Sequence, residues 1–295
     1  MSLKFGITPL DFVPTAERVI VNGVPDFSRF DIVDVIREAV DGGFPVVELT
    51  MDIVHIVPGS LSPGVVERLA DLRDELHHSY TVHLPFWSLE LASFNDDIRK
   101  ASVASIVKAI EVVEPLNPES YVLHTTGALG AEFSSKGFPE HLHRLVCALL
   151  TGFSATSVEE IITATEINPR LLAIENLDFP FEFTQDVVEE YDTSICFDVG
   201  HLVSKQSGTE SIIEFYRAHK NRIIEMHLHD GTYQEVDGFP HRTDHIALGE
   251  GEMPISDFFT ELVRDKFDYP LIFETSTREA ELSLERIRRL VPSAF

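Results

Sequence analysis

Acidic and imidazole side chains stand at the ends of apolar runs along this 295-residue chain. In the segment CFDVGH, residues 196–201, an apolar run closes on Asp198, and His201 follows three residues later. A carboxylate at this place predicts either the N-cap of a following helix or a metal ligand. For Asp198 alone the two readings are about equally good, so the other runs must decide between them.

Other apolar runs carry the same kinds of group at their ends: Glu48, His83, His124, Glu175, His227, His229 and Glu274. Residues two apart share a face of a regular strand, so His227 and His229 are expected to point the same way. Gathered at one place, such groups carry a large desolvation cost unless they are paired or bind a cation. Nitrogen and oxygen ligands without thiolates suit divalent Zn, Mn, Fe or Co. Neither Cys147 nor Cys196 is placed to be a ligand.

The elements that must position these groups alternate along the chain. Strand-like apolar runs cover 4–8, 46–52, 80–84, 120–125, 171–176, 194–199, 223–230 and 270–276. Amphipathic helical stretches lie between them, among them 98–116, ended by Pro115, and 157–167, opened by a Ser157 cap. Eight such pairs predict an α/β fold, a closed (β/α)8 TIM barrel forming one domain over residues 1–295, with the active site at the carboxyl ends of the strands.

An open doubly wound sheet is the alternative fold. That fold favours a Gly-x-Gly-x-x-Gly turn after an early strand, and the sequence has none. The stretch 230–254, rich in Gly, Asp and His, is predicted to be irregular. Irregular segments of this length in a compact domain are often functional.

The acidic balance of the chain bears on its partners. The formal net charge is −26, from 23 basic and 49 acidic residues. A nucleic-acid-binding protein needs a lysine and arginine footprint, so neither DNA nor RNA is expected as a partner. No signal peptide and no membrane-spanning apolar run is apparent, which predicts a cytoplasmic protein without membrane contact. A small-molecule substrate is therefore expected, and the oligomeric state stays open.

Seven short motifs at these places carry a family resemblance: VHLP (82–85), VLHTTG (122–127), IEN (174–176), DVGH (198–201), HLHD (227–230), HIALGEG (245–251) and FET (273–275). With them the chain resembles, over essentially its whole length, the xylose isomerase-like TIM barrels, which include endonuclease IV and many sugar phosphate isomerases and epimerases. The isomerase branch implies one divalent metal held by Glu175, Asp198, His227 and Glu274. The two glutamates of that set also pass a proton between adjacent carbons.

The endonuclease IV branch implies two or three metals, with the further ligands His83, His124, His201 and His245. That branch has Asp-x-His before Gly-Glu-Gly, whereas Asp244 here directly precedes His245, one residue out of register. This departure weakens the third metal site, and His229, where the branch has Asn, adds a candidate ligand. The segments YTVHLP and NDDIRKASV also resemble the cobamide-remodelling phosphodiesterases, which cut the nucleotide loop of corrinoids.

Three functions follow from these residues. The first is hydrolysis of a phosphoester of a small non-DNA substrate, in which metals activate water and Glu175 bridges two of them. Side chains expected to meet that substrate are His229, His241 and Arg242. The alternative is a sugar or sugar-phosphate isomerase or epimerase, in which Glu175 and Glu274 transfer the proton and His201 orients a hydroxyl. The third is a metal-binding barrel without activity, which the complete ligand set disfavours.

Overall fold

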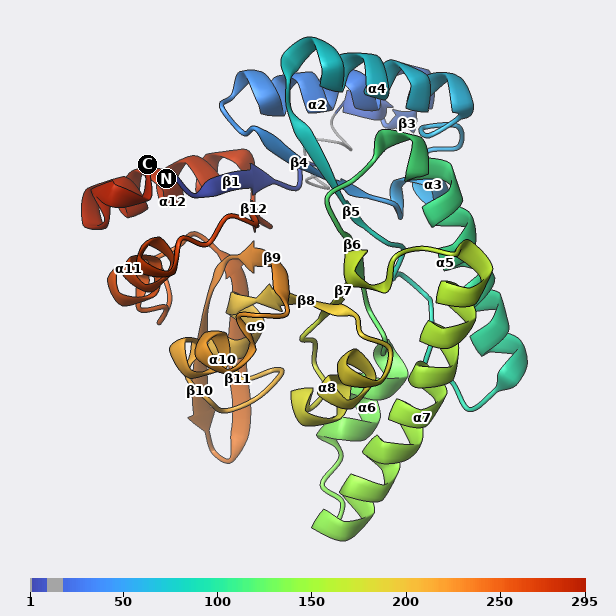
Figure 1. Ribbon diagram of the computed structural model, residues 1–295, viewed down its shortest axis with the longest axis vertical. Helices are drawn as coiled ribbons and strands as arrows, with labels where there is room; N and C mark the ends of the chain where they lie inside the picture. The colour runs from blue at the N-terminus through green and yellow to red at the C-terminus, as the bar shows by residue number, and fades with distance from the viewer. Residues whose placement is uncertain (1, 10–17) are drawn as a thin grey trace.

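The computed structural model describes residues 2–9 and 18–295 and shows a closed barrel of parallel strands (Figure 1). In chain order the barrel strands are β1 (Lys4–Ile7), β4 (Val46–Thr50), β5 (Ser79–His83), β6 (Tyr121–Leu123), β7 (Leu172–Glu175), β8 (Ser194–Asp198), β9 (Ile223–Leu228) and β12 (Pro270–Phe273). The order around the barrel is β1-β12-β9-β8-β7-β6-β5-β4, and β4 pairs with β1 to close it. Each predicted strand is therefore a barrel strand, and the closed barrel is confirmed over the open sheet.

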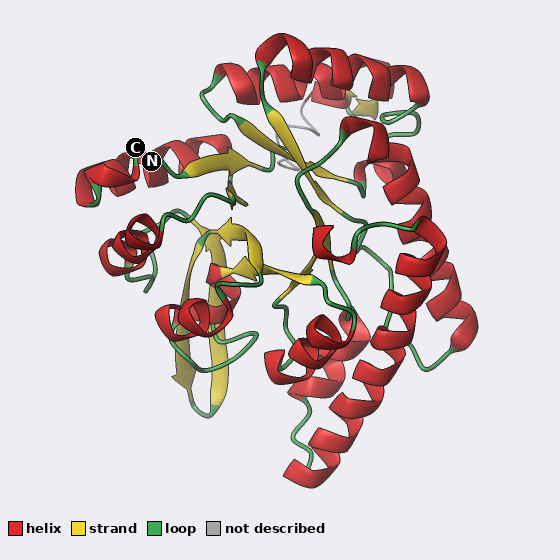
Figure 2. Ribbon diagram, in the orientation of Figure 1, coloured by secondary structure: helices red, strands yellow, loops and turns green. Residues whose placement is uncertain are grey.

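Helices surround the barrel and connect its strands (Figure 2). They are α2 (Ile32–Asp41), α3 (Ile53–Ile56), α4 (Pro63–Leu76), α5 (Asp96–Val113), α6 (Ala128–Ser135), α7 (Glu140–Thr165), α8 (Phe181–Glu190), α9 (Val199–Val203), α10 (Ile212–His219), α11 (Ile255–Asp265) and α12 (Thr277–Leu290). Short 3-10 turns are η1 (Phe27–Arg29), η2 (Glu114–Leu116), η3 (Pro169–Leu171) and η4 (Pro292–Ala294), and β2 (Ile20–Val21) pairs with β3 (Val24–Pro25). The α5 helix ends just before Pro115, as predicted.

The prediction that Ser157 caps a helix is wrong. Ser157 lies inside the 26-residue helix α7, where its buried hydroxyl donates a hydrogen bond to the Leu91 carbonyl at 2.7 Å. By length and composition α7 is apolar enough to cross a membrane. In this fold α7 packs against α5 and α8, and 44% of its most apolar window is buried. Its apolar character therefore fits a helix that covers a barrel.

The segment predicted to be irregular is largely an antiparallel hairpin, which corrects that prediction for residues 230–246. Strand β10 (Asp230–Val236) pairs with β11 (Phe239–Ile246), and the long arrows stand beside the barrel in Figure 2. Between the strands Asp237 and Gly238 both have positive φ, 53° and 80°. An Asp-Gly pair is a strong hairpin-turn signal because this conformation matches the twist of the strands.

One buried carboxylate fixes both ends of this hairpin. Asp230 Oδ2 accepts the backbone N–H groups of Gly249 and Gly251 at 2.6 and 3.1 Å. Its Oδ1 accepts those of Gly231 and Met253, both at 2.9 Å. A Cβ at Gly251 would overlap the Gly231 carbonyl, so the close approach of the two segments requires glycine. The chain after the hairpin is thereby tied to the end of β9.

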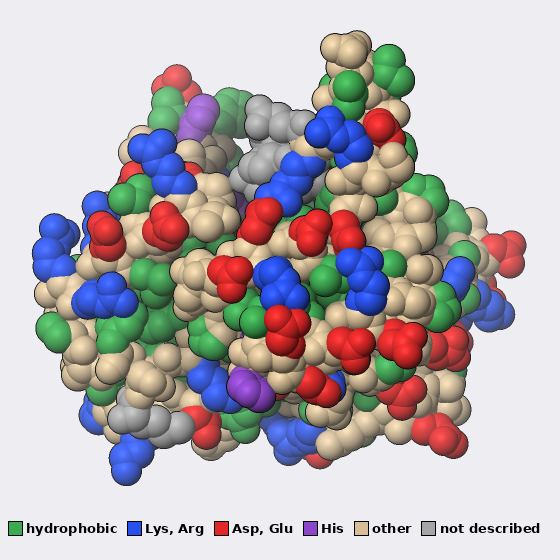
Figure 3. Space-filling view, turned by 90° about the horizontal axis from the view of Figure 1, so that it is seen from above, with side chains coloured by type: hydrophobic (Ala, Val, Ile, Leu, Met, Phe, Trp, Pro, Cys, Tyr) green, Lys and Arg blue, Asp and Glu red, His purple; other side chains and the backbone are tan. Residues whose placement is uncertain are grey.

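The surface over α2 and α4 has mixed charge despite the acidic total. These helices lie at the top of Figure 1 and face the viewer in Figure 3, where acidic and basic side chains are interspersed. Arg37 makes two hydrogen bonds of 2.9 Å to Glu75, and Arg68 contacts Asp31 at 2.6 Å. Exposed pairs of this kind contribute little stability, so this face is a solvated outer wall of the barrel.

Candidate metal centre

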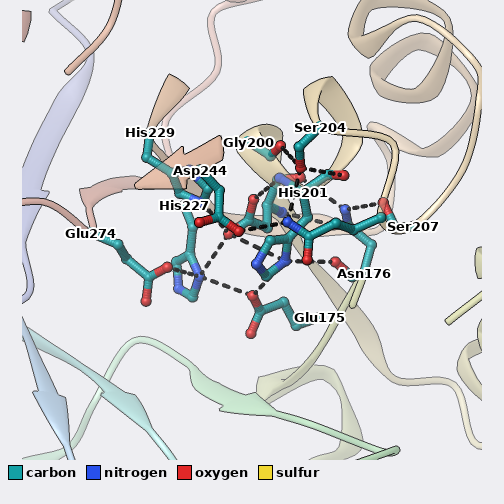
Figure 4. Close-up of polar contacts among 12 residues, drawn as sticks. Glu175, Asn176, Gly200, His201, Ser204, Ser207, His227, His229, Asp244 and Glu274 are labelled. Carbon is teal, nitrogen blue, oxygen red and sulfur yellow. Dashed lines mark hydrogen bonds and ion pairs between the residues drawn. The ribbon is translucent and has the colours of Figure 1, made fainter. Parts of the chain in front are cut away.

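The carboxyl ends of four barrel strands bring an imidazole and three carboxylates together. Figure 4 shows His227, Glu175 and Glu274 of this set pointing toward one another. His227 comes from β9, Glu175 ends β7, Asp198 ends β8, and Glu274 directly follows β12. The ligand atoms of these four side chains all lie within 4.8 Å of one another. His227 Nδ1 lies 3.2 Å from Glu274 Oε2, 3.4 Å from Glu175 Oε1 and 3.8 Å from Asp198 Oδ2.

These four groups fit a divalent metal. His227 Nδ1 is a buried atom without a hydrogen-bond partner, and it faces the three carboxylates. Three carboxylates held this close repel one another in a buried site unless a cation lies among them. One imidazole and three carboxylates are ligands for zinc, manganese, iron or cobalt. The predicted set Glu175, Asp198, His227 and Glu274 is therefore assembled by the fold.

His227 is oriented from behind by Glu48. Glu48 Oε2 lies 3.3 Å from His227 Nε2, and Glu48 Oε1 accepts a 2.7 Å hydrogen bond from the Thr8 hydroxyl. A carboxylate that accepts the Nε2–H leaves the Nδ1 lone pair free for a metal. The sequence predicted that Glu48 ends a strand beside the other candidate ligands. In the structure Glu48 lies within β4 and contacts Nε2 of His227, the ring nitrogen that faces away from those ligands.

A fifth carboxylate, absent from the sequence-based predictions, lies deeper in the barrel. Glu225 belongs to β9 and is fully buried near Glu48 and His227. Burial, reinforced by the charge of Glu48, raises the pKa of Glu225 to about 8, and the Ser120 hydroxyl donates to it. The available signal was a glutamate inside an apolar run, two residues before His227 and thus on the same strand face.

A second group of ligands shares Glu175 with the first. Glu175 Oε2 lies 2.8 Å from His124 Nε2 and 3.5 Å from His83 Nε2. The other oxygen, Oε1, lies 3.4 Å from His227 and 3.5 Å from His201. The two oxygens of this buried carboxylate thus face two different sets of imidazoles. A carboxylate in this position is suited to bridge two metals.

A third group consists of the imidazoles of His201, His229 and His245. His229 stacks on His245 with ring centroids 4.0 Å apart. His229 Nε2 lies 3.0 Å from Asp198 Oδ2, and its Nδ1 accepts the backbone N–H of His245 at 2.9 Å. A Cβ at Gly200 would overlap the His229 ring, so the glycine of the DVGH motif makes room for it.

Asp244 does not join these ligand groups. One of its oxygens lies 3.3 Å from His245 Nδ1, and the other accepts a 2.6 Å hydrogen bond from Gln206. The shift of one residue noted in the sequence thus places this carboxylate beside His245 and bonded to Gln206. His229, the additional ligand suggested by the sequence, does lie with His201 and His245.

The structure separates the three residues predicted to meet substrate. His229 is buried among the ligands. Arg242 donates to the Lys205 carbonyl at 3.0 Å and lines a hollow beside the site. His241 is exposed on β11 opposite Gln234, and it lies outside the ligand groups found among the described residues. The hairpin geometry therefore keeps Arg242 near the site and leaves His241 outside.

Asp198 combines the two roles that the sequence offered as alternatives. Its Oδ1 accepts the backbone N–H of His201 at 2.6 Å and caps α9, while Oδ2 faces His229 and His227. Asn176 holds the backbone of Asp198 by one hydrogen bond in each direction, at 2.7 and 2.8 Å. The carboxylate is thus both a helix cap and a candidate ligand.

The electrostatics of the site follow from burial and close pairing. Burial opposes the charge of His83, but Glu175, Glu48 and Glu274 outweigh it and raise the pKa of His83 to about 9. Burial likewise disfavours ionised Glu175, yet the charges of His124 and His227 lower its pKa well below the usual range. Burial has the opposite outcome for His124, whose pKa it lowers despite the nearby Glu175, so this ring favours the neutral form that a metal ligand requires.

Comparisons with known proteins agree with this fold. The family model described as "Xylose isomerase-like TIM barrel" matches residues 36–291. An uncharacterized protein of Methanocaldococcus jannaschii is 25% identical over 98% of this chain and 89% of its own length. A probable endonuclease 4 of Sulfurihydrogenibium sp. is 25% identical over 71% of this chain and 76% of its own. A crystal structure of a D-tagatose 3-epimerase-like protein superposes with a TM-score of 0.71 at 22% identity, covering 99% and 98% of the two chains.

Proposed function

Since the chain belongs to the xylose isomerase-like TIM-barrel family, we propose that it is a divalent-metal-dependent phosphoesterase. It hydrolyses a phosphoester of a small, non-DNA substrate at a centre of two or more metal ions. The observation that carries this proposal is the position of Glu175, whose two oxygens face different groups of imidazoles. A bridging carboxylate is needed for a cluster of metals, whereas an isomerase with one metal does not require it.

The residues have distinct parts in this reaction. The first metal would be held by Glu175, Asp198, His227 and Glu274, and the second by His83, His124 and Glu175. When bound, such metals lower the pKa of a water molecule and neutralise phosphate oxygens. The chain also orients one of these ligands, because Glu48 holds the Nε2 side of the His227 ring.

The imidazoles of His201 and His245 adjoin this centre. His201 Nδ1 is 3.5 Å from Glu175 and 3.6 Å from Asp198, so it is held between the two strand ends. His245 is about half exposed and 3.8 Å from Glu274. Together with His229 these residues are proposed to complete the metal cluster or to contact the phosphate.

The charge of the chain supports a small substrate over DNA. A net charge of −26 opposes the approach of a polyanion and provides few cations for its phosphates. A small phosphoester carries little charge, and the metals themselves neutralise it. The proposal is therefore restricted to small substrates, although one relative is named as an endonuclease.

A sugar epimerase or isomerase is the second candidate. Glu175 and Glu274 lie on either side of His227 Nδ1, at 3.4 and 3.2 Å, and offer two carboxylates to a bound sugar. Such a pair suits proton abstraction and return at neighbouring carbons. This reaction gives no necessary part to His83 and His124, which is why we rank it second.

Metal content and a substrate panel separate the two candidates. Two or more metals per chain by elemental analysis, with turnover of phosphomonoesters or phosphodiesters, is the expected result. His83→Ala and His124→Ala should each remove the second metal and the hydrolytic activity. A single metal, unchanged in both variants, with turnover of ketoses or aldoses alone, would contradict hydrolysis and support the epimerase.

A further inference from the structure

The metal centre lies between the first two of three hollows that form a row on the carboxyl face of the barrel. One hollow of about 390 Å³ has His83, His245 and Glu274 in its wall, and a second of about 380 Å³ has His124 and His201. Phe86 and Trp87 form part of both walls. The two hollows are thus neighbours on either side of these aromatic rings.

A third hollow of about 370 Å³ extends the row toward the hairpin. It shares Asp178 and Gln206 with the second hollow, and Lys205 and Arg242 lie in its wall. Ligand sites of about 300 to 1,000 Å³ are usual for small molecules. Each hollow alone is near the lower limit of this range, and the three together exceed its upper limit. A substrate the size of one sugar ring would leave most of this space unused.

The aromatic part of the row is rigidly placed although Trp87 is half exposed. The buried carboxylate of Asp52 accepts the backbone N–H of Phe86 at 3.0 Å and that of Trp87 at 3.3 Å. The Phe86 ring lies 4.6 Å from His124 and 4.9 Å from His83, measured between centroids. An exposed indole on a fixed backbone beside a metal centre is a platform for a flat apolar group.

The third hollow has a different chemistry because its charges are mixed. Lys205 and Arg242 are both held on the ring of Tyr233, at 4.3 and 5.9 Å from its centroid. Three carboxylates lie in the same wall, those of Asp178, Glu182 and Glu210. Two cations against three anions do not favour an anionic ligand. Donors and acceptors in this mixture suit hydroxyl groups, which both donate and accept hydrogen bonds.

Four hydroxyl side chains also line that wall: Ser134, Ser135, Ser207 and Thr209. Ser207 also accepts a 3.0 Å hydrogen bond from Asn176, the residue that holds Asp198. The polar hollow is therefore connected to the metal centre through one buried amide. A group bound there would lie on the side of the centre that faces away from the first hollow.

We propose that the substrate is a phosphodiester with two unlike substituents, one with a flat apolar face against Trp87 and one rich in hydroxyl groups between Lys205 and Arg242. This inference rests on the proposed phosphoesterase function and gives its substrate class. In the reaction the water oxygen bonds to phosphorus and the P–O bond to one substituent breaks. That substituent leaves as an alcohol with a proton from the water, and the other remains on a phosphate monoester.

Matched chromogenic diesters test the proposal on the metal-loaded protein. The probes are p-nitrophenyl glyceryl phosphate and p-nitrophenyl propyl phosphate, which differ only in two hydroxyls, with p-nitrophenyl phosphate as the monoester. We expect kcat/KM for the glyceryl diester to exceed that for the propyl diester at least ~10-fold, because a site built to bond a hydroxyl rejects the analogue that lacks it. The monoester should be poorer than either diester.

Two variants locate the substituents. Arg242→Ala should remove the preference for glyceryl over propyl, and Trp87→Ala should raise KM for both diesters to a similar degree. Arg37→Ala, an exposed arginine on α2, is the control and should change neither.

Equal rates on the two diesters in the unaltered protein, or equal rates on monoester and diesters, would overturn this inference and leave phosphoester hydrolysis standing. So would an Arg242→Ala variant that keeps the glyceryl preference. Absence of turnover on all three probes, with turnover of a sugar instead, would overturn the phosphoesterase proposal and this inference together.

Discussion

Glu48 Oε2 lies 3.3 Å from Nε2 of His227, while the other ring nitrogen, Nδ1, faces Glu175, Asp198 and Glu274. The imidazole is thus held between Glu48 on one side and three candidate ligand carboxylates on the other. This relationship fixes which nitrogen is offered to a metal. Carboxylates that hold a ligating histidine in this way raise its basicity and its affinity for the metal.

Glu48→Ala is therefore expected to weaken metal binding by about 10- to 100-fold, the usual effect of losing such a partner. Competition with a chromogenic chelator measures the change. Glu48→Gln keeps an oxygen for the Nε2–H and should lose less. Glu75→Ala, which removes an exposed carboxylate on α4, is the control. Unaltered affinity in Glu48→Ala would show that His227 needs no support from below.

Asp198→Asn separates the two roles of this residue. The amide oxygen can still accept the backbone N–H of His201 and cap α9, but the carboxylate charge that faces the metal is lost. We expect activity to fall by more than about 100-fold, beyond the usual effect of losing an outer partner, while the urea unfolding midpoint of the metal-free protein changes little. Asp198→Ala should lose the cap as well and about 1 kcal/mol more stability. Full activity and full metal content in Asp198→Asn would exclude Asp198 as a ligand.

Gly200→Ala should disrupt the third group of imidazoles. The added methyl group overlaps the ring of His229, which must move away from Asp198 and His245. Crowding of this kind in a packed interior costs about 1–3 kcal/mol, measurable by urea unfolding. Gly152→Ala is the matched control because a methyl group there, on the exposed face of α7, meets open space and favours the helix. Equal stability of the two variants would mean that the ring adapts at no cost.

Removal of metal should lower stability, because ligands that bind only the folded state stabilise it by mass action. At a free metal concentration about 100-fold above Kd the contribution is about 2.7 kcal/mol. Dialysis against a chelator should lower the thermal midpoint, and added Zn²⁺ or Mn²⁺ should restore it. In a variant with Glu175→Ala and His227→Ala the midpoint should be indifferent to the chelator. A midpoint of the unaltered protein that ignores the chelator would argue against a bound cation.

His78 predicts acid sensitivity that is independent of the metal centre. Burial, with a smaller contribution from Arg73, lowers the pKa of His78 to about 4, and neither of its ring nitrogens has a partner. As the pH falls below 6.5, His78 becomes protonated in the unfolded chain but stays neutral in the folded chain. The free energy of unfolding therefore decreases until the pH reaches about 4. Between pH 7.5 and 5.0 this effect amounts to about 2 kcal/mol.

The comparison of variants isolates this effect from the other titrating groups. In His78→Leu the difference between the free energies of unfolding at pH 7.5 and pH 5.0 should shrink by about that amount. The exposed His55 offers a control in His55→Leu, for which the difference should stay as in the unaltered protein. The same pH dependence in all three proteins would show that His78 does not remain neutral in the fold.

The barrel and most of the site were predictable because one rule places both. Strands buried on two faces appear as apolar runs, and in a closed parallel barrel their carboxyl ends must meet. Asp198, at the end of such a run, could therefore be placed beside Glu175 from the sequence. The same rule placed His83 and His124, which both contact Glu175.

The parts that were missed depend on contacts between segments or on local signals that were overlooked. The role of Glu48 beneath His227 depends on the register of strands far apart in the chain. Ser157 resembled a cap because Glu160 follows it three residues later, and only the structure shows that α7 continues through it, with its hydroxyl bonded to the Leu91 carbonyl. The hairpin was within reach, since Asp237 and Gly238 form a typical turn pair between strand-like segments.

The four hydrogen bonds to Asp230 give the hairpin a particular architectural status. The Asp230 carboxylate bonds to the chain at both ends of the hairpin, so residues 232–243 form an insertion whose two ends are held by one side chain. The insertion can be lengthened, shortened or exchanged without changing the path of the chain at β9 or at Met253. Changes at Arg242 and around it in this hairpin would therefore leave the candidate metal ligands on the barrel strands in place.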